Sequence, residues 1–161
     1  MDLDYRIIFE TVGPSLYRLA FSFVNNRSDA EDVIQEVFLR LLQTNRRFDD
    51  EDSLKRWLMT VTANRCKDLM RSARWRKEVS VEPTKLEYSK PTNQDDKLDV
   101  GAAIFQLDEK YRIVVYLYYY EGYATKEISK ILHISQSAVL SRLERARNRL
   151  KQLLGGEWLD G

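Results

Sequence analysis

The chain has 161 residues, 43% of them hydrophobic and 32% charged, which describes a globular soluble protein of one domain or two small ones and excludes a disordered chain or a large enzyme scaffold. One cysteine, Cys66, and one histidine, His133, exclude an internal disulfide and a cysteine–histidine metal cluster; we expect a buried Cys66 thiol and neither metal nor cofactor. The net charge is only +1, no apolar run approaches the roughly 20 residues of a membrane span, and the start MDLDYR lacks a signal pattern, so we expect a cytoplasmic protein.

Two helices are predicted in the first 42 residues. Residues 3–24 carry apolar side chains at helical spacing, and Gly13-Pro14 either starts a new helix or kinks this one. Ser28 to Glu31 has the pattern of a capping box, with Ser28 as the N-cap of a regular helix over 28–42. The inward stripe of this helix is Ala30, Val33, Ile34, Val37, Phe38, Leu41 and Leu42, and its outer face shows Asp29, Asp32, Gln35, Glu36, Leu39 and Arg40. Periodicity alone leaves open whether that outer face is solvated or binds a partner.

A third helix follows the acidic loop 45–52. Ser53 can cap it, and the pattern predicts helix from Leu54 to about Lys77. An inward stripe is formed by Leu54, Leu58, Thr62, Cys66, Leu69 and Ala73, widened by Trp57 and Val61. The opposite face carries Arg56, Thr60, Asn64, Lys67, Arg71 and Arg74. Amide and hydroxyl groups among cations suit the recognition of a nucleic acid strand, and a solvated surface is the competing interpretation.

Periodicity stops over 78–97, where Pro83 and Pro91 lie among polar residues. We interpret this stretch as a linker between a domain at 1–77 and a domain at 98–161. Residues 98–106 predict a short helix. Residues 107–120 have high strand propensity, but their apolar positions keep helical spacing, so we predict helix. Their tyrosine cluster is either a base-stacking platform or, as we favour, part of the core.

Residues 122–154 have the pattern of a helix-turn-helix. Ile128, Ile131 and Leu132 recur at helical spacing, and Ser135 can cap a second helix after the interruption at His133. The inward stripe of the second helix is Val139, Leu143, Ala146, Leu150 and Leu153.

The outward side of that second helix has polar residues in the middle and cations at both edges. The middle holds Ser137, Ser141, Glu144 and Asn148; one flank holds Arg142, Arg145 and Arg149, and the other Arg147 and Lys151. Such a face suits a helix in the major groove of DNA, where base edges meet the middle and phosphates meet the flanks. A charged solvated face is again the alternative.

Three motifs in order carry a resemblance that covers nearly the whole chain. SDAEDVIQEVFLRLL (28–42), WLMTVTANRCKDLMR (57–71) and YRIVVYLYYYEGYATKEISKILHISQSAVLSRLERARNRL (111–150) closely resemble the extracytoplasmic-function (ECF) sigma factors, which consist of sigma domains two and four. The resemblance implies an all-α protein of two small helical bundles, domain two at 1–77 and domain four at 98–161, joined by a polar linker at 78–97. It implies a factor that binds core RNA polymerase, directs it to promoters and helps to open them.

The resemblance also assigns residues to partners. It implies that the helix after Ser28 contacts the β′ clamp of core RNA polymerase through Asp32, Gln35, Glu36, Leu39 and Arg40. It implies that the opened −10 strand is bound by Phe48, Ser53, Arg56, Thr60, Asn64, Lys67, Arg71 and Arg74. The −35 duplex would be read by Ser135, Gln136, Ser137, Ser141, Arg142, Glu144, Arg145 and Arg149. The β flap of the polymerase and an anti-sigma protein are further implied partners, and no small-molecule substrate is implied.

This chain departs from the family pattern at several positions. His133 stands where members usually have glycine, so either it adopts a left-handed conformation or the turn differs. Ala124 replaces the usual capping serine, which weakens that cap unless Thr125 takes over. Leu140, Asp108 and Glu144 also replace more usual residues, and we expect Glu144 to accept a hydrogen bond from a cytosine amino group or to exclude phosphate.

The sequence thus favours a transcription initiation factor that is not an enzyme, since it shows no nucleophile–base pair and no phosphate-cradling glycine loop. A stand-alone helix-turn-helix regulator would bind duplex DNA tightly without polymerase. A polymerase-bound adaptor or antagonist would support no promoter-dependent initiation. A nucleic-acid enzyme is the most distant alternative.

Overall fold

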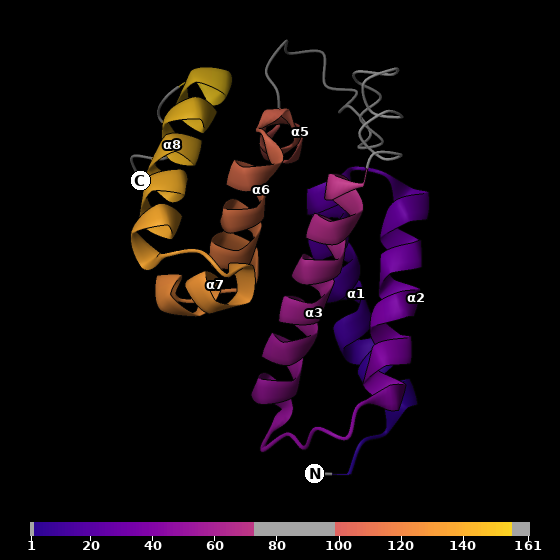
Figure 1. Ribbon diagram of the computed structural model, residues 1–161. Coiled ribbons are helices and arrows are strands. Elements are labelled where there is room, and N and C mark those ends of the chain that lie inside the picture. Colours follow the sequence, from indigo (N-terminus) through magenta and orange to yellow (C-terminus); the bar gives the residue numbers. More distant parts are fainter. Residues whose placement is uncertain (1, 73–98, 156–161) are drawn as a thin grey trace. The chain divides into compact units, whose positions relative to one another are not determined.

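The computed structural model describes residues 2–72 and 99–155, which form two compact units that are considered separately below. Every regular element in these two ranges is a helix (Figure 1). The prediction of an all-α protein with two small bundles is confirmed. The predicted linker at 78–97 lies outside the described residues.

The N-terminal unit consists of three helices packed around one core. They are α1 (Tyr5–Val24), α2 (Arg27–Gln43) and α3 (Glu51–Arg71), and α1 contacts both of the others along its length (Figure 1). The most completely buried large side chains are Leu16, Leu19, Val33, Leu41, Leu54, Leu58 and Met59. The core of this unit therefore lies where the predicted apolar stripes meet. Each buried leucine contributes about 1.5–3 kcal/mol to the free energy of unfolding.

Several predicted helix boundaries in this unit are wrong. Gly13-Pro14 does not start a new helix, because α1 continues through Pro14. The N-cap of α2 is Asn26, whose side chain accepts from the N–H of Asp29 at 2.9 Å, and not Ser28. Asn25 ends α1 in the left-handed conformation, so Asn26 is the first extended residue and takes the cap position.

The third helix also begins and ends differently from the prediction. Asp50 caps α3 by accepting from the Ser53 N–H at 2.7 Å, so Ser53 already lies within the first turn. This hydrogen bond lowers the pKa of the Asp50 carboxyl. The helix ends at Arg71 and Ser72 is extended, so α3 does not continue unbroken as predicted. The rest of the predicted helix, residues 73–77 with Arg74, lies outside the described residues. Leu42, predicted to face inward, is 56% exposed.

Helix α1 is the one helix among the described residues that is both long and apolar. Over 18 residues its mean hydropathy reaches 1.2, so by length and composition it could cross a membrane, contrary to the expectation that no segment approaches this level. Half of that window is buried inside the bundle, including Leu16, Leu19 and Ala20. The core helix of a water-soluble bundle has the same composition, and the packing of α1 against α2 and α3 accounts for its apolar face.

The C-terminal unit contains a short helical hairpin followed by the helix-turn-helix. Its elements are α5 (Val100–Gln106), α6 (Glu109–Val115), the π-helix η1 (Tyr116–Tyr120), α7 (Thr125–Leu132) and α8 (Gln136–Leu154). Helices α5 and α6 pack against α8, and α7 crosses beneath it (Figure 1). One core cluster joins them through Ala103, Ile104, Leu107, Val115, Ala146 and Leu150.

The segment with strand propensity is helical, as the spacing predicted, but it contains a π-helical turn that the pattern did not indicate. The N–H of Glu121 donates to the Tyr116 carbonyl at 3.1 Å, five residues back. Tyr116 is buried, whereas Tyr119 and Tyr120 are 49% and 61% exposed. The prediction that the tyrosines pack the core therefore holds for Tyr116 and is wrong for Tyr119 and Tyr120.

Arg112 is a buried cation at the corner between α5 and α6. Its guanidinium donates to the Leu107 carbonyl at 3.0 Å and lies over the Phe105 ring, 5.0 Å from the centroid. Burial lowers the pKa of Arg112 to about 10. The side chain thus satisfies the carbonyl of Leu107, the C-cap residue of α5, and holds the corner at which the hairpin turns.

Candidate polymerase and nucleic-acid interfaces

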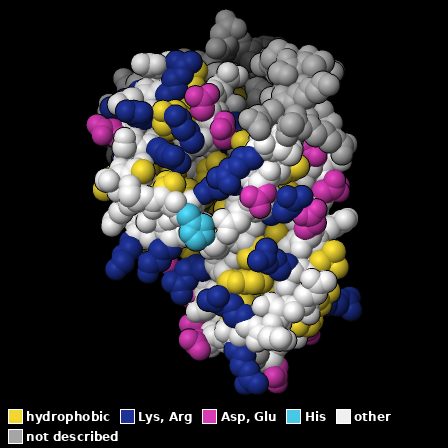
Figure 2. All heavy atoms as spheres, in the orientation of Figure 1, with side chains coloured by type: hydrophobic (Ala, Val, Ile, Leu, Met, Phe, Trp, Pro, Cys, Tyr) yellow, Lys and Arg dark blue, Asp and Glu magenta, His cyan; other side chains and the backbone are white. Residues whose placement is uncertain are grey.

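The turn of the helix-turn-helix is built around His133 in the left-handed conformation. Its φ is 55° and its ψ 44°, which settles the sequence alternatives in favour of a left-handed histidine. The N–H of Ile134 donates to the Ser129 carbonyl at 3.1 Å, and the Ser129 hydroxyl donates to the Ile134 carbonyl at 2.8 Å. These bonds close the corner in the manner of a glycine-terminated helix, with the histidine exposed at the surface, as the cyan side chain in Figure 2 shows.

We predict that His133→Gly stabilises the C-terminal unit by about 0.5–1 kcal/mol, because glycine adopts positive φ without the steric cost of a side chain. His133→Ala should give no such gain, because alanine has the same steric cost as histidine at positive φ. Urea unfolding of the full chain measures both effects. Equal midpoints for the glycine and alanine variants would contradict the importance of backbone strain at this turn.

The start of α7 has half of a capping box. Ala124 has no side-chain acceptor, and Glu127 accepts from the Ala124 N–H at 3.1 Å. Thr125 does not replace the missing cap; its hydroxyl accepts from the Gln136 amide at 2.9 Å. Gln136, predicted to read the −35 duplex, therefore ties the first turn of α8 to the first turn of α7.

The outward face of α8 has the composition predicted for it. Ser135 caps the helix by accepting from the Ala138 N–H at 3.1 Å, and Val139, Leu143, Ala146 and Leu150 are buried. All predicted −35 readers except the half-buried Arg142 are exposed: Ser135, Gln136, Ser137, Ser141, Glu144, Arg145 and Arg149. Polar groups capable of reading bases and cations capable of holding phosphates thus share one solvent-facing surface.

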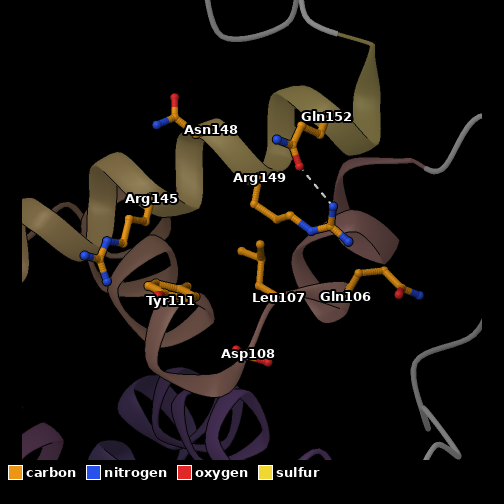
Figure 3. A pocket seen from close by; sticks show the side chains of 8 residues that line it. All are labelled: Gln106, Leu107, Asp108, Tyr111, Arg145, Asn148, Arg149 and Gln152. Atoms are coloured by element: carbon orange, nitrogen blue, oxygen red, sulfur yellow. Dashed lines mark hydrogen bonds between the residues drawn. The ribbon is translucent and has the colours of Figure 1, made fainter.

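One flank of α8 borders a cavity of about 400 Å³, lined by Gln106, Leu107, Asp108, Tyr111, Arg145, Asn148, Arg149 and Gln152. Figure 3 shows Arg145 and Arg149 extending from α8 over Tyr111 and Leu107. A hydrogen bond from Arg145 lowers the pKa of the Tyr111 phenol, and Arg149 donates to Gln152 at 3.0 Å (Figure 3). Both guanidinium groups are therefore oriented by neighbours while remaining exposed.

The other flank of α8 contacts two tyrosines of η1, the half-buried Tyr118 and the exposed Tyr119. Arg147 donates to the Tyr119 hydroxyl at 2.7 Å and lies 5.8 and 5.7 Å from the ring centroids of Tyr118 and Tyr119. Arg147 thus combines a hydrogen bond with cation–π contacts to two rings.

The predicted strand-binding face of α3 is only partly exposed. Arg56 and Arg71 are exposed, whereas Thr60, Asn64 and Lys67 are half-buried. The Thr60 hydroxyl donates its proton to the Arg56 carbonyl at 2.9 Å. Its oxygen can still accept a hydrogen bond from a base. This face includes the cationic and amide groups that the sequence pattern placed on it.

Phe48 does not belong to this exposed face. It is 5% exposed, and its ring lies 5.4 Å from that of Trp57, centroid to centroid. Contact of this ring with a base would require it to leave the interior, so we remove Phe48 from the strand-binding set. Its place is structural, because it anchors the loop between α2 and α3 ahead of the Asp50 cap. Ser53 is half-buried in the first turn of α3.

The outer face of α2 is acidic and exposed. Asp32, Gln35, Glu36, Leu39 and Arg40 all lie on the solvent side, and Leu39 is 55% exposed. Glu36 is paired within the unit with Arg65 of α3, and the Nη2–Oε1 contact of this pair measures 3.4 Å. This hydrogen bond raises the pKa of Arg65. Sequence reasoning did not identify Arg65 as a partner, because the two residues are 29 positions apart.

Cys66, the single cysteine of the chain, lies in the interior of the N-terminal unit. Cys66 is fully buried, which confirms the prediction, and this burial raises the pKa of its thiol. Among residues 2–72 and 99–155 no group of three or more His, Cys, Asp or Glu side chains could hold a metal ion. Figure 2 shows Lys and Arg interspersed with Asp and Glu on the visible face, in agreement with a net charge of +1.

Comparison with known proteins identifies two family segments in the predicted order. Residues 8–76 match Sigma-70 region 2, and residues 97–150 match Sigma-70, region 4. The chain is 33% identical over 155 residues to the ECF RNA polymerase sigma factor SigL of Mycobacterium tuberculosis, covering 92% of this chain and 88% of that protein. It is 30% identical over 138 residues to the RNA polymerase sigma factor SigZ of Bacillus subtilis, covering 83% of this chain and 77% of that protein.

Solved structures agree with these sequence matches. The sigma factor RpoE in its complex with the anti-sigma factor NepR from Bartonella quintana superposes with a TM-score of 0.72 at 26% identity, covering 96% of this chain and 98% of that chain. CnrH, in its complex with the cytosolic domain of CnrY, gives a TM-score of 0.63 at 24% identity, covering 95% of this chain and 88% of that chain. With both sigma regions in order and relatives matched over most of their length, this chain belongs to the ECF family of RNA polymerase sigma factors.

Proposed function

We propose that this sigma factor binds core RNA polymerase through α2, the opened −10 strand through α3 and the −35 duplex through α8. The observation that carries the proposal is that one chain exposes an acidic face on α2 and polar faces edged by cations on α3 and α8. The family matches at 8–76 and 97–150 support the division into a domain at 1–77, a linker at 78–97 and a domain at 98–161. As an initiation factor, the protein acts in the cytoplasm and carries out no catalysis itself.

On α2, Asp32, Gln35, Glu36, Leu39 and Arg40 would contact the β′ clamp. Exposed carboxylates around an exposed Leu39 suit a partner that offers cations and an apolar contact. The β flap would be contacted by the domain that holds α8.

On α3, the strand-binding set becomes Ser53, Arg56, Thr60, Asn64, Lys67, Arg71 and Arg74. A single strand offers both phosphates and unpaired base edges. Guanidinium and ammonium groups would hold the phosphates, while Asn64 and Thr60 would reach the bases. Phe48 would support this surface from inside the unit.

On α8, the −35 duplex would meet Ser135, Gln136, Ser137, Ser141, Arg142, Glu144, Arg145 and Arg149. Glu144 is exposed at the centre of this set and offers only acceptors when ionised. It would accept from a cytosine amino group or keep phosphate away from that position.

We predict that Glu144→Ala changes base preference at one or two positions of the −35 element, with a discrimination change of about 1–3 kcal/mol. Selection of −35 sequences by the full chain bound to core polymerase measures this preference. An unchanged preference together with unchanged affinity would contradict a reading role for Glu144.

An anti-sigma protein is a further proposed partner. The support is the similarity to RpoE, whose structure was determined in complex with the anti-sigma factor NepR. Such a protein would act by covering the faces of α2 and α8 that polymerase and promoter DNA would otherwise contact.

Run-off transcription by core polymerase on a promoter library, with and without this protein, tests the proposed function. Defined start sites that depend on the protein are expected. Tight duplex binding without polymerase and no start-site choice would favour a stand-alone regulator. Polymerase binding without initiation would favour an adaptor or antagonist.

A further inference from the structure

The ion pair between Glu36 and Arg65 joins the proposed polymerase face to the neighbouring helix. The Arg65 guanidinium contacts both carboxylate oxygens of Glu36, Nε with Oε2 and Nη2 with Oε1. The Glu36 side chain is 49% exposed and the Arg65 side chain 39%, so the pair lies at the surface where α2 and α3 pack together. A two-point contact of this kind fixes both the position and the plane of the carboxylate.

Arg65 is directed away from the proposed strand-binding face of its own helix. At about 100° per residue, it is offset by about 100° from Asn64 and by about 200° from Lys67. On the strand-binding face, Arg71 lies 3.9 Å from Asp68 of the same helix. Arg65 therefore lies beside the acidic face of α2.

The geometry points to Arg65 as a positioning residue that presents the Glu36 carboxylate to the polymerase. This inference rests on the proposed role of Glu36. Each carboxylate oxygen has two acceptor directions, and Arg65 uses one on each oxygen, which leaves the others for donors on a partner. Holding Glu36 in one conformation before binding avoids the loss of side-chain freedom that a mobile glutamate would suffer on binding.

A double-mutant cycle with the full chain tests the inference. Affinity for core RNA polymerase is measured by fluorescence anisotropy for the wild type, Arg65→Ala, Glu36→Ala and the double variant. Arg65→Ala should weaken binding about three- to tenfold, the effect of ordering one flexible side chain. In the Glu36→Ala background the same change should alter affinity less than about twofold, since Arg65 acts through Glu36.

Further variants separate positioning from folding and from charge. Arg65→Lys keeps the charge but makes one contact in place of two, so it should restore part of the affinity. Arg6→Ala removes an exposed cation from a pair with Glu10 on α1 and should leave polymerase affinity unchanged. Urea unfolding shows whether each variant remains folded at the assay temperature.

The outcomes distinguish this inference from the proposed function. If Glu36→Ala does not weaken polymerase binding, the proposed contact of Glu36 fails. If Glu36→Ala weakens binding but Arg65→Ala does not, only the positioning role is overturned. Equal losses from Arg65→Ala in both backgrounds would also overturn it, because Arg65 would then act independently of Glu36.

Discussion

Changing Asp32 and Glu36 together to Asn and Gln is expected to weaken binding to core RNA polymerase by about 10- to 100-fold. Both carboxylates are exposed on α2, and the double change removes two charges while keeping side-chain size. A charge-assisted hydrogen bond is about 1 kcal/mol stronger than a neutral one, and the amide oxygens of Asn and Gln can still accept a neutral bond. The two changes together therefore lose about 2 kcal/mol, which is an effect of this size. Anisotropy titration of the full chain with core polymerase measures the loss.

A control with the same change in charge lies on the same unit. Glu10 of α1 and Glu31 of α2 are both exposed, and each pairs with an arginine four residues away in the same helix. Glu10→Gln with Glu31→Gln should leave polymerase affinity within about twofold, because such surface pairs contribute little. Equal losses in the two double variants would indicate a general charge effect and contradict a local contact at Asp32 and Glu36.

Arg142→Ala with Arg145→Ala is expected to abolish most of the dependence of transcription on the −35 element. Loss of two arginine contacts to duplex DNA should weaken −35 recognition by about 10- to 1000-fold. It should also reduce the slope of the logarithm of affinity against the logarithm of salt concentration by about two. Run-off transcription from matched promoters with and without the −35 element, at several salt concentrations, measures both effects.

Arg147→Ala is the matched control for this prediction. It removes one arginine from the same helix, where the double variant removes two, and its guanidinium contacts Tyr118 and Tyr119 on the other flank. The variant should keep its preference for promoters with a −35 element. A loss as large as that of the Arg142 and Arg145 variant would place DNA on the tyrosine flank instead.

Helical periodicity predicted the faces of the helices well. On α8 the spacing placed Val139, Leu143, Ala146 and Leu150 correctly in the interior, while Leu153 is half-buried. The polar face between the cationic flanks is exposed. This success has a simple cause: a regular helix repeats every 3.6 residues, so the face of a side chain follows from its position in the sequence. Helical spacing also decided correctly against the strand propensity of residues 107–120.

The ends of helices and the contacts between distant residues could not be predicted from periodicity. Asn26 and Ser28 are both good N-caps, and only the left-handed Asn25 decides between them. Phe48 lies in a polar loop, and its burial against Trp57 depends on the packing of α2 and α3. Arg65 and Arg147 resemble other surface cations until folding brings Glu36 and Tyr119 beside them.

In the proposed function, the polymerase holds the α3 and α8 surfaces at a fixed distance on one promoter. Each surface binds its promoter element weakly, and the two together bind more tightly. Run-off transcription from promoters that differ only in the spacing between the −10 and −35 elements measures this requirement directly. Initiation dependent on this protein should peak at one spacing and fall steeply when base pairs are added or removed. Initiation that is indifferent to spacing, or that does not require the protein, would contradict the proposed arrangement.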